Sequence, residues 1–507
     1  MGLAKSFSAQ LVGLKSEVVN IEVDITKGLH SFSVVGLGDR AVEESKDRIA
    51  AAIKNSGFVS PKQKNQKIVI SLAPADIRKE GPSFDLGMAI AYLLASEDID
   101  FEPEGKMFLG ELSLEGKLCK IHGILPILCQ ARSQGFTEAY ISMDNSEESS
   151  LVEDITVYPA RSLNEVIEHL TGKRNISPNP KKYISSDTKD EKDLDMSNIK
   201  GNEVAKRGLE IAAAGAHNII MCGPPGTGKT MLAKSFSSIL PNLSYEQAIE
   251  VTSIHSVAQN LNKGFIHKPP FRSPHHTASY PSVVGGGGFP KPGEITLAHR
   301  GVLFLDEFPE FHKSVIEALR QPLEDRIITI SRARGVITFP AQCILIASMN
   351  PCPCGKGSGN GCTCTMKSLQ AYRHKISGPI FDRLDVWLNI NKIDYAKLSS
   401  KESNAEKSIT IRERVIKARE IQKRRFASNN INKIFNSEMS ASDLENIIKM
   451  EESARSTLTK SAEKMELSGR SFHRIIKMSQ TIADLAGSET ITNEHILEAL
   501  QYRQKIL

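Results

Sequence analysis

The stretch Gly223–Thr230, GPPGTGKT, constrains the fold of this chain more than any other part of its sequence. It follows the apolar run IIMC and opens a helix that begins with MLAKSF. Between a strand and a helix, the pattern G-x-x-x-x-G-K-[ST] is the P-loop, which binds nucleotide phosphates. Its glycines let backbone N–H groups curl around phosphate, and the helix N-terminus adds positive potential. The predicted ATP-binding residues are Gly223, Pro224, Pro225, Gly226, Thr227, Gly228, Lys229 and Thr230.

Polar residues follow two further apolar strands. In GVLFLDEF, Asp306 and Glu307 come directly after a buried strand, and QCILIASMN ends in Asn350. We expect Lys229 to reach the β- and γ-phosphates and Thr230 and Asp306 to hold Mg²⁺. Glu307 suits polarising the attacking water, and the amide of Asn350 can orient that water. Without the upstream P-loop, a strand ending in two solvated acids would be the ordinary interpretation; with it, the sequence predicts ATP hydrolysis with Mg²⁺.

Composition changes divide the chain into four segments. Residues 1–172 alternate strand-like and helical patterns, and 173–197 form a polar, charged linker. A second α/β domain covers 198–393, and 394–507 is helical throughout. The predicted fold class is therefore α/β and multidomain, in agreement with a length of 507 residues.

Bulk properties limit where the protein works. No apolar run approaches the roughly 20 residues that span a bilayer, and the first residues lack the apolar core of a secretory signal. Gly2 and Ser6 match the short myristoylation pattern, but the rest of the chain favours a cytoplasmic protein without a membrane partner. The net charge of +5 is a weak indication of polyanion partners. The basic face of 412–425 is typical of a solvated helix face.

Four of the eight cysteines are crowded into one stretch with the spacing C-x-C-x7-C-x-C. Two thiolate pairs joined by a glycine-rich loop can fold back and give a tetrahedral, structural Zn²⁺ site. Pairwise disulfides and an unliganded loop are the alternatives. The candidate zinc ligands are Cys352, Cys354, Cys362 and Cys364. The remaining thiols, expected to be buried, are Cys119, Cys129, Cys222 and Cys343.

The order of P-loop, acid pair, terminal Asn and then Arg383 in SGPIFDRLDVWLNI resembles the AAA+ ATPases. The resemblance implies that Arg383 completes a neighbouring subunit's site, where it stabilises charge on the transferred phosphoryl group. In LSGRSFHRIIK, Arg470 resembles the sensor-2 arginine, which reaches the γ-phosphate from a helical lid. Arg474, one turn later, is the alternative.

Three longer segments narrow the resemblance: PFRSPHHTASYPSVVGGGGFPKPGEITLAHRGVLFLDEFPEF, NPCPCG and ISGPIFDRLD. They resemble the ComM/YifB family of bacterial magnesium-chelatase-like AAA+ ATPases, and the likeness covers nearly the whole chain. It implies a homo-hexameric, ATP-driven motor on DNA, with recombination proteins as partners. The implied activity is branch migration, a helicase activity, during natural transformation. One departure is Asn202 in IKGNE, where the family often has Gln; the amide is kept.

Two segments are candidate DNA contacts. DRIITISRARGVITFPAQ predicts a hairpin with Arg332 and Arg334 near its tip. In related AAA+ clades a hairpin here points into the ring channel, where two arginines per subunit would form a basic collar. A solvated tip is the alternative. The preceding loop, rich in Pro, Gly and His, offers Arg272, His275 and His276, with a mobile surface loop as the alternative.

KEGPSFDLGMAIA resembles the Gly-Pro-Ser stretch of Lon-type proteases, with Ser83 at the nucleophile's position. A serine nucleophile needs a base, which in those proteases is a lysine further along the chain. In the matching segment, KIHGILPIL, Leu125 stands at that position, and leucine cannot take a proton. We therefore expect residues 1–172 to have a Lon-protease-like (ribosomal S5 domain 2-like) α+β fold without protease activity, used for assembly or partner binding.

The sequence leaves two rival functions. A chelatase-type ATPase would remodel a metal-inserting partner enzyme, and the ATPase core resembles magnesium chelatase subunits. The Lon-like domain and the cysteine cluster argue against it. An ATP-dependent protease or protein unfoldase is the other rival; Leu125 argues against proteolysis, but not against unfolding.

Overall fold

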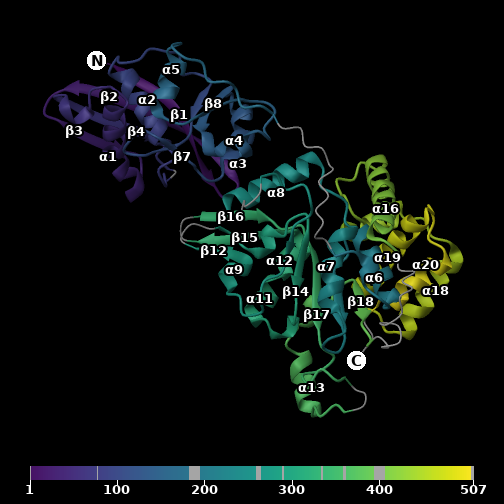
Figure 1. The fold of residues 1–507 in the computed structure, drawn as a ribbon. Coiled ribbons are helices and arrows are strands. Elements are labelled where there is room, and N and C mark those ends of the chain that lie inside the picture. Colours follow the sequence, from purple (N-terminus) through teal and green to yellow (C-terminus); the bar gives the residue numbers. More distant parts are fainter. Residues whose placement is uncertain are drawn as a thin grey trace. The chain divides into compact units, whose positions relative to one another are not determined.

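In the computed structural model the chain folds into two units (Figure 1). The structure describes residues 2–76, 78–181, 194–258, 264–287, 291–332, 335–357, 361–392 and 406–503. The first unit comprises Met1–Ser185 together with Ala248–Ile266, and the second comprises Ser186–Gln247 together with His267–Leu507. The predicted linker 173–197 is described only at its two ends.

The second unit is built on a five-stranded sheet in the order β11-β14-β17-β10-β18, in which all neighbouring strands run parallel. The three central strands are apolar runs buried along their whole length, as expected for a parallel sheet that is covered on both faces. Because parallel strands end at the same edge, the residues that follow them meet there. The strands are β10 (Ile219–Cys222), β11 (Phe271–Arg272), β14 (Val302–Leu305), β17 (Ile344–Met349) and β18 (Val386–Asn389).

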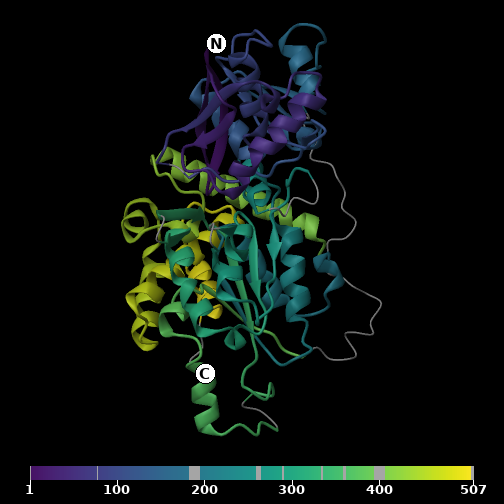
Figure 2. The same cartoon turned by 90° about the vertical axis from the view of Figure 1, so that its left-hand side faces the viewer.

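The C-terminal helices share their hydrophobic core with the sheet. Val415 and Met478 from these helices are buried in the same cluster as Leu209 and Ile219. In Figures 1 and 2 the yellow C-terminal helices accordingly lie against α6 and the sheet. The helices are α6 (Glu203–Gly215), α7 (Lys229–Ile239), α16 (Ser408–Ser428), α17 (Ala441–Ile447), α18 (Glu452–Lys464), α19 (Gly469–Ala486) and α20 (Asn493–Gln501).

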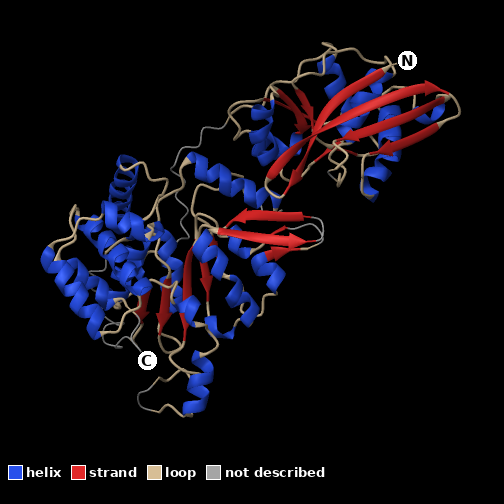
Figure 3. Cartoon of the chain, turned by 180° about the vertical axis from the view of Figure 1, so that it is seen from behind, coloured by secondary structure: helices blue, strands red, loops and turns tan. Residues whose placement is uncertain are grey.

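The predicted hairpin is confirmed, because β15 (Ile327–Arg332) and β16 (Gly335–Pro340) pair antiparallel with Ile327 opposite Pro340. Figure 3 shows the two strands in red. In the part of the chain that the structure describes, no helix is both long and apolar enough to cross a membrane. The shorter elements of this unit are α9 (Tyr280–Val284), β12 (Gly285–Gly286), β13 (Lys291–Pro292), α10 (Glu294–Leu297), α11 (Lys313–Ala318), α12 (Arg320–Asp325), α13 (Met366–Arg373) and α14 (Gly378–Phe381).

The first unit contains a four-stranded sheet in the order β1-β2-β4-β3 and a parallel sheet in the order β5-β8-β9. In β2 and β4, buried and more exposed residues alternate, as expected where one face of a sheet packs on helices. Its elements are β1 (Leu3–Val12), β2 (Lys15–Lys27), β3 (Ser31–Val35), α1 (Arg40–Asn55), β4 (Gln66–Ala73), α2 (Asp85–Ala95), β5 (Lys106–Phe108), β6 (Glu111–Leu112), β7 (Leu118–Cys119), α3 (Ile124–Ala131), β8 (Glu138–Ser142), α4 (Ser146–Ser149), β9 (Thr156–Ala160) and α5 (Leu163–Leu170).

Most of helix α8 (Tyr245–Val257) belongs to the first unit, although its sequence lies within the predicted ATPase segment. Ile249 packs against the core of that unit. The hydroxyl of Ser256 accepts a hydrogen bond of 3.1 Å from the N–H of Gly123 and donates one to the half-buried Glu148. The first unit is therefore completed by an insertion from a distant part of the chain.

The expected α/β architecture is confirmed, and the sheet of the second unit is parallel. The Lon-like character of the first unit, the lid role of the C-terminal helices and the domain boundaries stay predictions. Burial of the isolated thiols was predicted only partly correctly. Cys222 and Cys343 are buried, whereas Cys119 is half-buried and Cys129 is exposed.

Candidate nucleotide site

The P-loop joins β10 to α7, and Lys229 is the first residue of that helix. Gly226 and Gly228 have φ angles of +76° and +88°, which glycine adopts without strain. The Nζ of Lys229 donates to the carbonyl oxygens of Gly223 at 2.6 Å and Pro224 at 3.0 Å. Burial lowers the pKa of Lys229, against the opposing effect of nearby carboxylates.

The two predicted magnesium ligands already touch. The hydroxyl of Thr230 donates a 3.0 Å hydrogen bond to Oδ2 of Asp306. The other oxygen, Oδ1, accepts from the Ser348 hydroxyl and, at 3.1 Å, from the N–H of Glu307. Oxygen ligands of this kind suit Mg²⁺. Sequence reasoning missed Ser348; its only signal was one small polar residue in the otherwise apolar run ILIASM, two positions before Asn350.

Asn350 and Glu307 complete the group at this edge of the sheet. Oδ1 of Asn350 accepts a hydrogen bond of 3.1 Å from Nζ of Lys229. Glu307 follows Asp306 in a left-handed backbone conformation, with φ of +51°. Its Oε2 lies 3.4 Å from Nδ1 of His276, a residue that we expected to contact DNA. The structure therefore brings together Lys229, Thr230, Asp306, Glu307 and Asn350.

The predicted arginines lie at the other edge of the sheet. β10 and β18 run parallel, with Ile219 opposite Val386 and Cys222 opposite Asn389. The P-loop follows Cys222, at the carboxyl end of its strand. Arg383 comes three positions before Val386, at the amino end of the neighbouring strand. It is therefore separated from the P-loop of its own chain by the length of the sheet.

Arg470 shares the location of Arg383. Both line a cavity of about 810 Å³. Arg383 is ion-paired with Glu324, and this hydrogen bond lowers the pKa of Glu324, with the charge of Arg470 adding to the effect. Arg474 also lies here, since its Nη1 donates to the Leu384 carbonyl at 2.7 Å. The sensor-2 comparison would place Arg470 beside the nucleotide phosphates. In the structure, Arg470 instead lies away from the P-loop lysine of its own chain.

The candidate DNA contacts are dispersed. The guanidinium of Arg272 donates two hydrogen bonds of 2.6 Å to the carboxylate of Glu294. The ring of His275 lies 4.2 Å from that of His276, between centroids. Arg332 is the last residue of β15, and Arg334 lies outside the described residues.

The basic face of 412–425 is solvated only in part: Lys417, Lys423 and Arg424 are exposed, whereas its other arginines are bonded to the rest of the unit. Arg412 donates to the Ser238 carbonyl at 2.9 Å, and Arg414 lies 2.5 Å from Glu210. Arg425 pairs with the buried Asp484.

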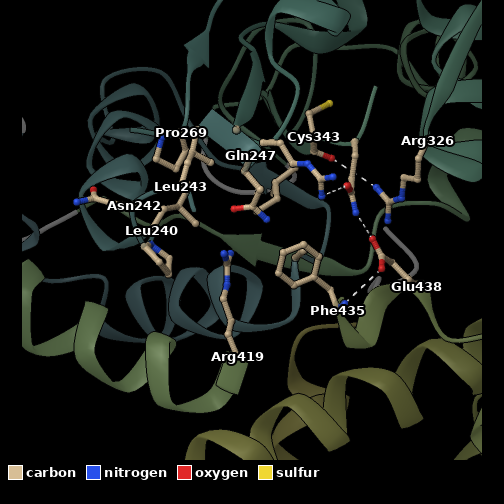
Figure 4. Close-up of a pocket in the computed structure, with 16 residues that line it drawn as sticks. Leu240, Asn242, Leu243, Gln247, Pro269, Arg326, Cys343, Arg419, Phe435 and Glu438 are labelled. Carbon is tan, nitrogen blue, oxygen red and sulfur yellow. Dashed lines mark hydrogen bonds between the residues drawn. The ribbon is translucent and has the colours of Figure 1, made fainter. Parts of the chain in front are cut away.

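Arg419 of the same helix reaches a pocket at the amino ends of β14 and β17 (Figure 4). It donates to the Ala213 carbonyl at 2.7 Å and lies 4.7 Å from the ring centroid of Phe435. Burial lowers the pKa of Arg419 to about 10. Opposite, Glu438 accepts hydrogen bonds from the Gln342 side chain and the Phe435 N–H. This face of α16 therefore joins the helix to the sheet.

The four clustered thiols lie together, with the sulfur atoms all within 4.8 Å of one another. Sγ of Cys352 is 3.3 Å from that of Cys354 and 3.9 Å from that of Cys362, and Cys354 is 3.7 Å from Cys362. Four sulfurs around a tetrahedral Zn²⁺ with Zn–S bonds of about 2.3 Å are about 3.8 Å apart. The N–H of Lys356 is the main cause that lowers the pKa of Cys354 to about 6. The donor set and its spacing therefore suit a zinc ion.

In the first unit, the two positions compared with Lon-type proteases differ in burial. Ser83 is half-buried at the start of α2, and Leu125 is fully buried in the core. Asp85, also fully buried, pairs with Nε of Arg48 at 2.8 Å. The position after Phe84 is thus occupied by an internal ion pair.

Comparisons with known proteins agree along the chain. The family model "Magnesium chelatase, subunit ChlI" matches residues 195–398, "Subunit ChlI of Mg-chelatase" matches 21–145 and "Magnesium chelatase, subunit ChlI C-terminal" matches 405–503. Competence protein ComM of Haemophilus influenzae is 41% identical over 510 residues, covering 100% of this chain and 98% of that protein.

Two further relatives extend the comparison. Uncharacterized protein YifB of Escherichia coli is 40% identical over 507 residues, covering 99% of this chain and 97% of that protein. DNA replication licensing factor Mcm6 of Drosophila melanogaster is 24% identical over 329 residues, covering 61% of this chain and 36% of that protein. Because the first two relatives match along nearly their whole length, the chain belongs to the ComM/YifB family of magnesium-chelatase-like AAA+ proteins.

Proposed function

We propose that this protein is an ATP-hydrolysing AAA+ motor that acts on DNA as a homo-hexamer in the cytoplasm. Its proposed activity is branch migration, a helicase activity, in homologous recombination during natural transformation. The proposal rests on the nucleotide site, on the position of two arginines and on the relatives.

ATP hydrolysis is supported by the group at the carboxyl edge of the sheet. Lys229 is positioned for the phosphates, and Thr230 and Asp306 for Mg²⁺, which bridges and neutralises them. Glu307 would act as the base for the attacking water, and Asn350 would orient it. The side chain of Asn350 already accepts a hydrogen bond from Lys229, so these two side chains lie together at the carboxyl edge of the sheet.

The single observation that carries the motor proposal is the separation of Arg383 and Arg470 from the P-loop of their own chain. Positive charge aimed at the transferred phosphoryl group accelerates hydrolysis strongly. Since neither arginine can supply it in its own subunit, each is proposed to supply it to the next. A contact of this head-to-tail kind forms a ring when its rotation closes, and the family resemblance supports six subunits.

DNA as the substrate is supported by the relatives and by charge. One relative is a competence protein, and a more distant one is a DNA replication licensing factor. The chain carries a net charge of +5, and strand β15 of the hairpin ends in Arg332, with Arg334 two positions later in the sequence. Arg272 is not part of this proposal as a free contact, because Glu294 occupies it. We assign assembly or binding of recombination partners to the first unit.

The alternative is a chelatase-type or protein-remodelling ATPase without a DNA substrate, favoured by the three matches to magnesium chelatase subunit models. Steady-state ATPase activity separates the two. It is measured without DNA and with single strands, duplex or a four-way junction, and Glu307→Gln serves as the blank.

Strong stimulation by single strands or junctions, reduced in Arg332→Ala/Arg334→Ala, is expected for the DNA motor. Lys417→Ala/Lys423→Ala, which removes two exposed cations of α16, is the matched charge control. An ATPase rate that none of the three DNAs changes overturns the DNA proposal and favours remodelling of a protein.

A further inference from the structure

The cysteine cluster lies directly against the P-loop. Gly355, between the two thiol pairs, approaches Pro225 so closely that a Cβ atom there would lie 2.8 Å from Cδ of the proline. Gly355 has a φ of +79°, a conformation that other residues adopt only with strain. Glycine is therefore required at this position both by the turn and by the phosphate-binding loop that it touches.

A second connection runs through the chain itself. Cys352 comes two positions after Asn350, whose side chain accepts from Lys229 and whose carbonyl accepts from the Tyr372 hydroxyl at 3.3 Å. Tyr372 is buried, and burial raises its pKa. The start of the cluster is thus fixed to the residue that holds the P-loop lysine.

The cluster has the local geometry of a thiolate site. Cys352 is buried, and its sulfur accepts the N–H of Gly357 at 3.2 Å, which stabilises a thiolate. Its neighbour sulfurs surround one point rather than lying in two bonded pairs, since Cys354 is nearly as close to Cys362 as to Cys352. Two disulfides would join the four sulfurs in pairs and would not require all four to surround one point.

We propose that Zn²⁺ bound by Cys352, Cys354, Cys362 and Cys364 is part of the nucleotide site: it holds Gly355 against Pro225, so that ATP affinity depends on zinc occupancy. The inference rests on the proposed nucleotide site, but not on DNA as substrate. In this proposal the zinc ion takes no part in the hydrolysis of ATP itself. Its contribution is to fix the loop between Asn350 and the P-loop in one conformation before the nucleotide arrives.

The first test measures zinc per chain by atomic emission and the Kd of a fluorescent ATP analogue with Mg²⁺, without DNA. The wild type is expected to hold about one zinc per chain. Cys352→Ser/Cys362→Ser is expected to lose the zinc and to bind the analogue about tenfold more weakly, a loss of about 1.4 kcal/mol. Cys119→Ser/Cys129→Ser, which removes two thiols outside the cluster, is the matched control and should change neither value.

Gly355→Ala separates the contact from the metal. It keeps all four thiols, so it should retain zinc while weakening nucleotide binding. Removing zinc from the wild type with a chelator and restoring it tests the same link without any substitution, and the affinity should fall and return.

A cluster variant without zinc but with wild-type affinity overturns the proposal, as does a wild type that stays free of zinc when it is refilled under reducing conditions. A protein that binds zinc and ATP as expected but ignores DNA would overturn only the proposed substrate.

Discussion

The hydroxyl of Thr230 donates a 3.0 Å hydrogen bond to Asp306, although the two residues are 76 positions apart in the sequence. This contact joins the helix after β10 to the end of β14, two strands that are separated in the sheet by β17. Ser348 of β17 bonds the other oxygen of the same carboxylate. Contacts from three strands thus fix the orientation of the Asp306 carboxylate. The side chain of its neighbour Glu307 takes no part in these contacts and can have a different role.

The two acids are expected to respond differently to loss of charge. Asp306→Asn should lose most Mg²⁺-dependent nucleotide binding, because the amide is a poor magnesium ligand. Glu307→Gln should bind ATP with Mg²⁺ nearly as well as the wild type but hydrolyse it about 10²- to 10⁴-fold more slowly, the usual contribution of a general base. Binding of a fluorescent ATP analogue with and without Mg²⁺, together with steady-state hydrolysis, checks both. Equal loss of binding in the two variants would contradict this division of roles.

Arg383 and Arg470 are expected to act on the neighbouring subunit. Arg383→Ala should reduce kcat about 10³-fold or more while leaving ATP binding intact, as for other arginines that enter a site in trans. Mixing inactive Arg383→Ala with inactive Glu307→Gln should restore activity. An intact Glu307 of the first variant then faces an intact Arg383 of the second. Arg470→Ala should behave in the same way.

The control for this experiment is a mixture of Arg383→Ala with Arg383→Ala/Glu307→Gln, in which no site can be complete. Hydrolysis that stays absent in the first mixture, in rings shown to contain both variants, would mean that Arg383 does not act in trans.

The sequence predicted those features that depend on neighbouring residues. The P-loop, the acids after β14 and the hairpin each follow from a short pattern of apolar and special residues, and the structure places them in the expected elements. Contacts across the fold were not predictable in this way. No local pattern shows that Glu294 lies beside Arg272 or that α19 brings Arg470 to the amino ends of the strands. The basic face of α16 was misjudged in part for the same reason, since the partners of its four bonded arginines come from α6, α7 and α19.

Arg272 and Glu294 should behave as one structural unit. Each of Arg272→Ala and Glu294→Ala should lower the free energy of unfolding, because each leaves a partly buried charge without its partner. The double variant should cost less than the sum of the single ones, with a coupling of about 1–3 kcal/mol for a two-bond pair. Urea unfolding of the four proteins measures this coupling. Additive effects, or a loss of DNA stimulation at unchanged stability, would show instead that Arg272 serves a ligand.

His217 and Asp385 connect the sheet to helix α19 and should make its packing depend on pH. Nδ1 of His217 lies 3.3 Å from Asp385, and its Nε2 lies 2.9 Å from the Thr481 hydroxyl. Burial alone would raise the pKa of Asp385. The hydrogen bond from His217, with the charges of Arg474 and Lys477, lowers it below its ordinary value of 3.8.

A carboxyl group whose pKa is lower in the folded state stabilises that state fully above its unfolded pKa, and this contribution is lost as the pH falls below that value. Asp385→Asn should therefore be less stable than the wild type by about 2 kcal/mol at pH 7, the usual size for a hydrogen bond to a charged group. The difference should persist to about pH 5 and shrink below the ordinary pKa of 3.8.

Urea unfolding of both proteins between pH 7 and pH 3.5 measures this difference. Asp382→Asn is the matched control, because Asp382 also faces Arg474 at 3.7 Å but its side chain is 41% exposed. Solvent screens such a pair, so its removal should cost less than about 1 kcal/mol at every pH. A stability difference for Asp385→Asn that grows as the pH falls would show that burial, and not the partners of Asp385, controls its protonation.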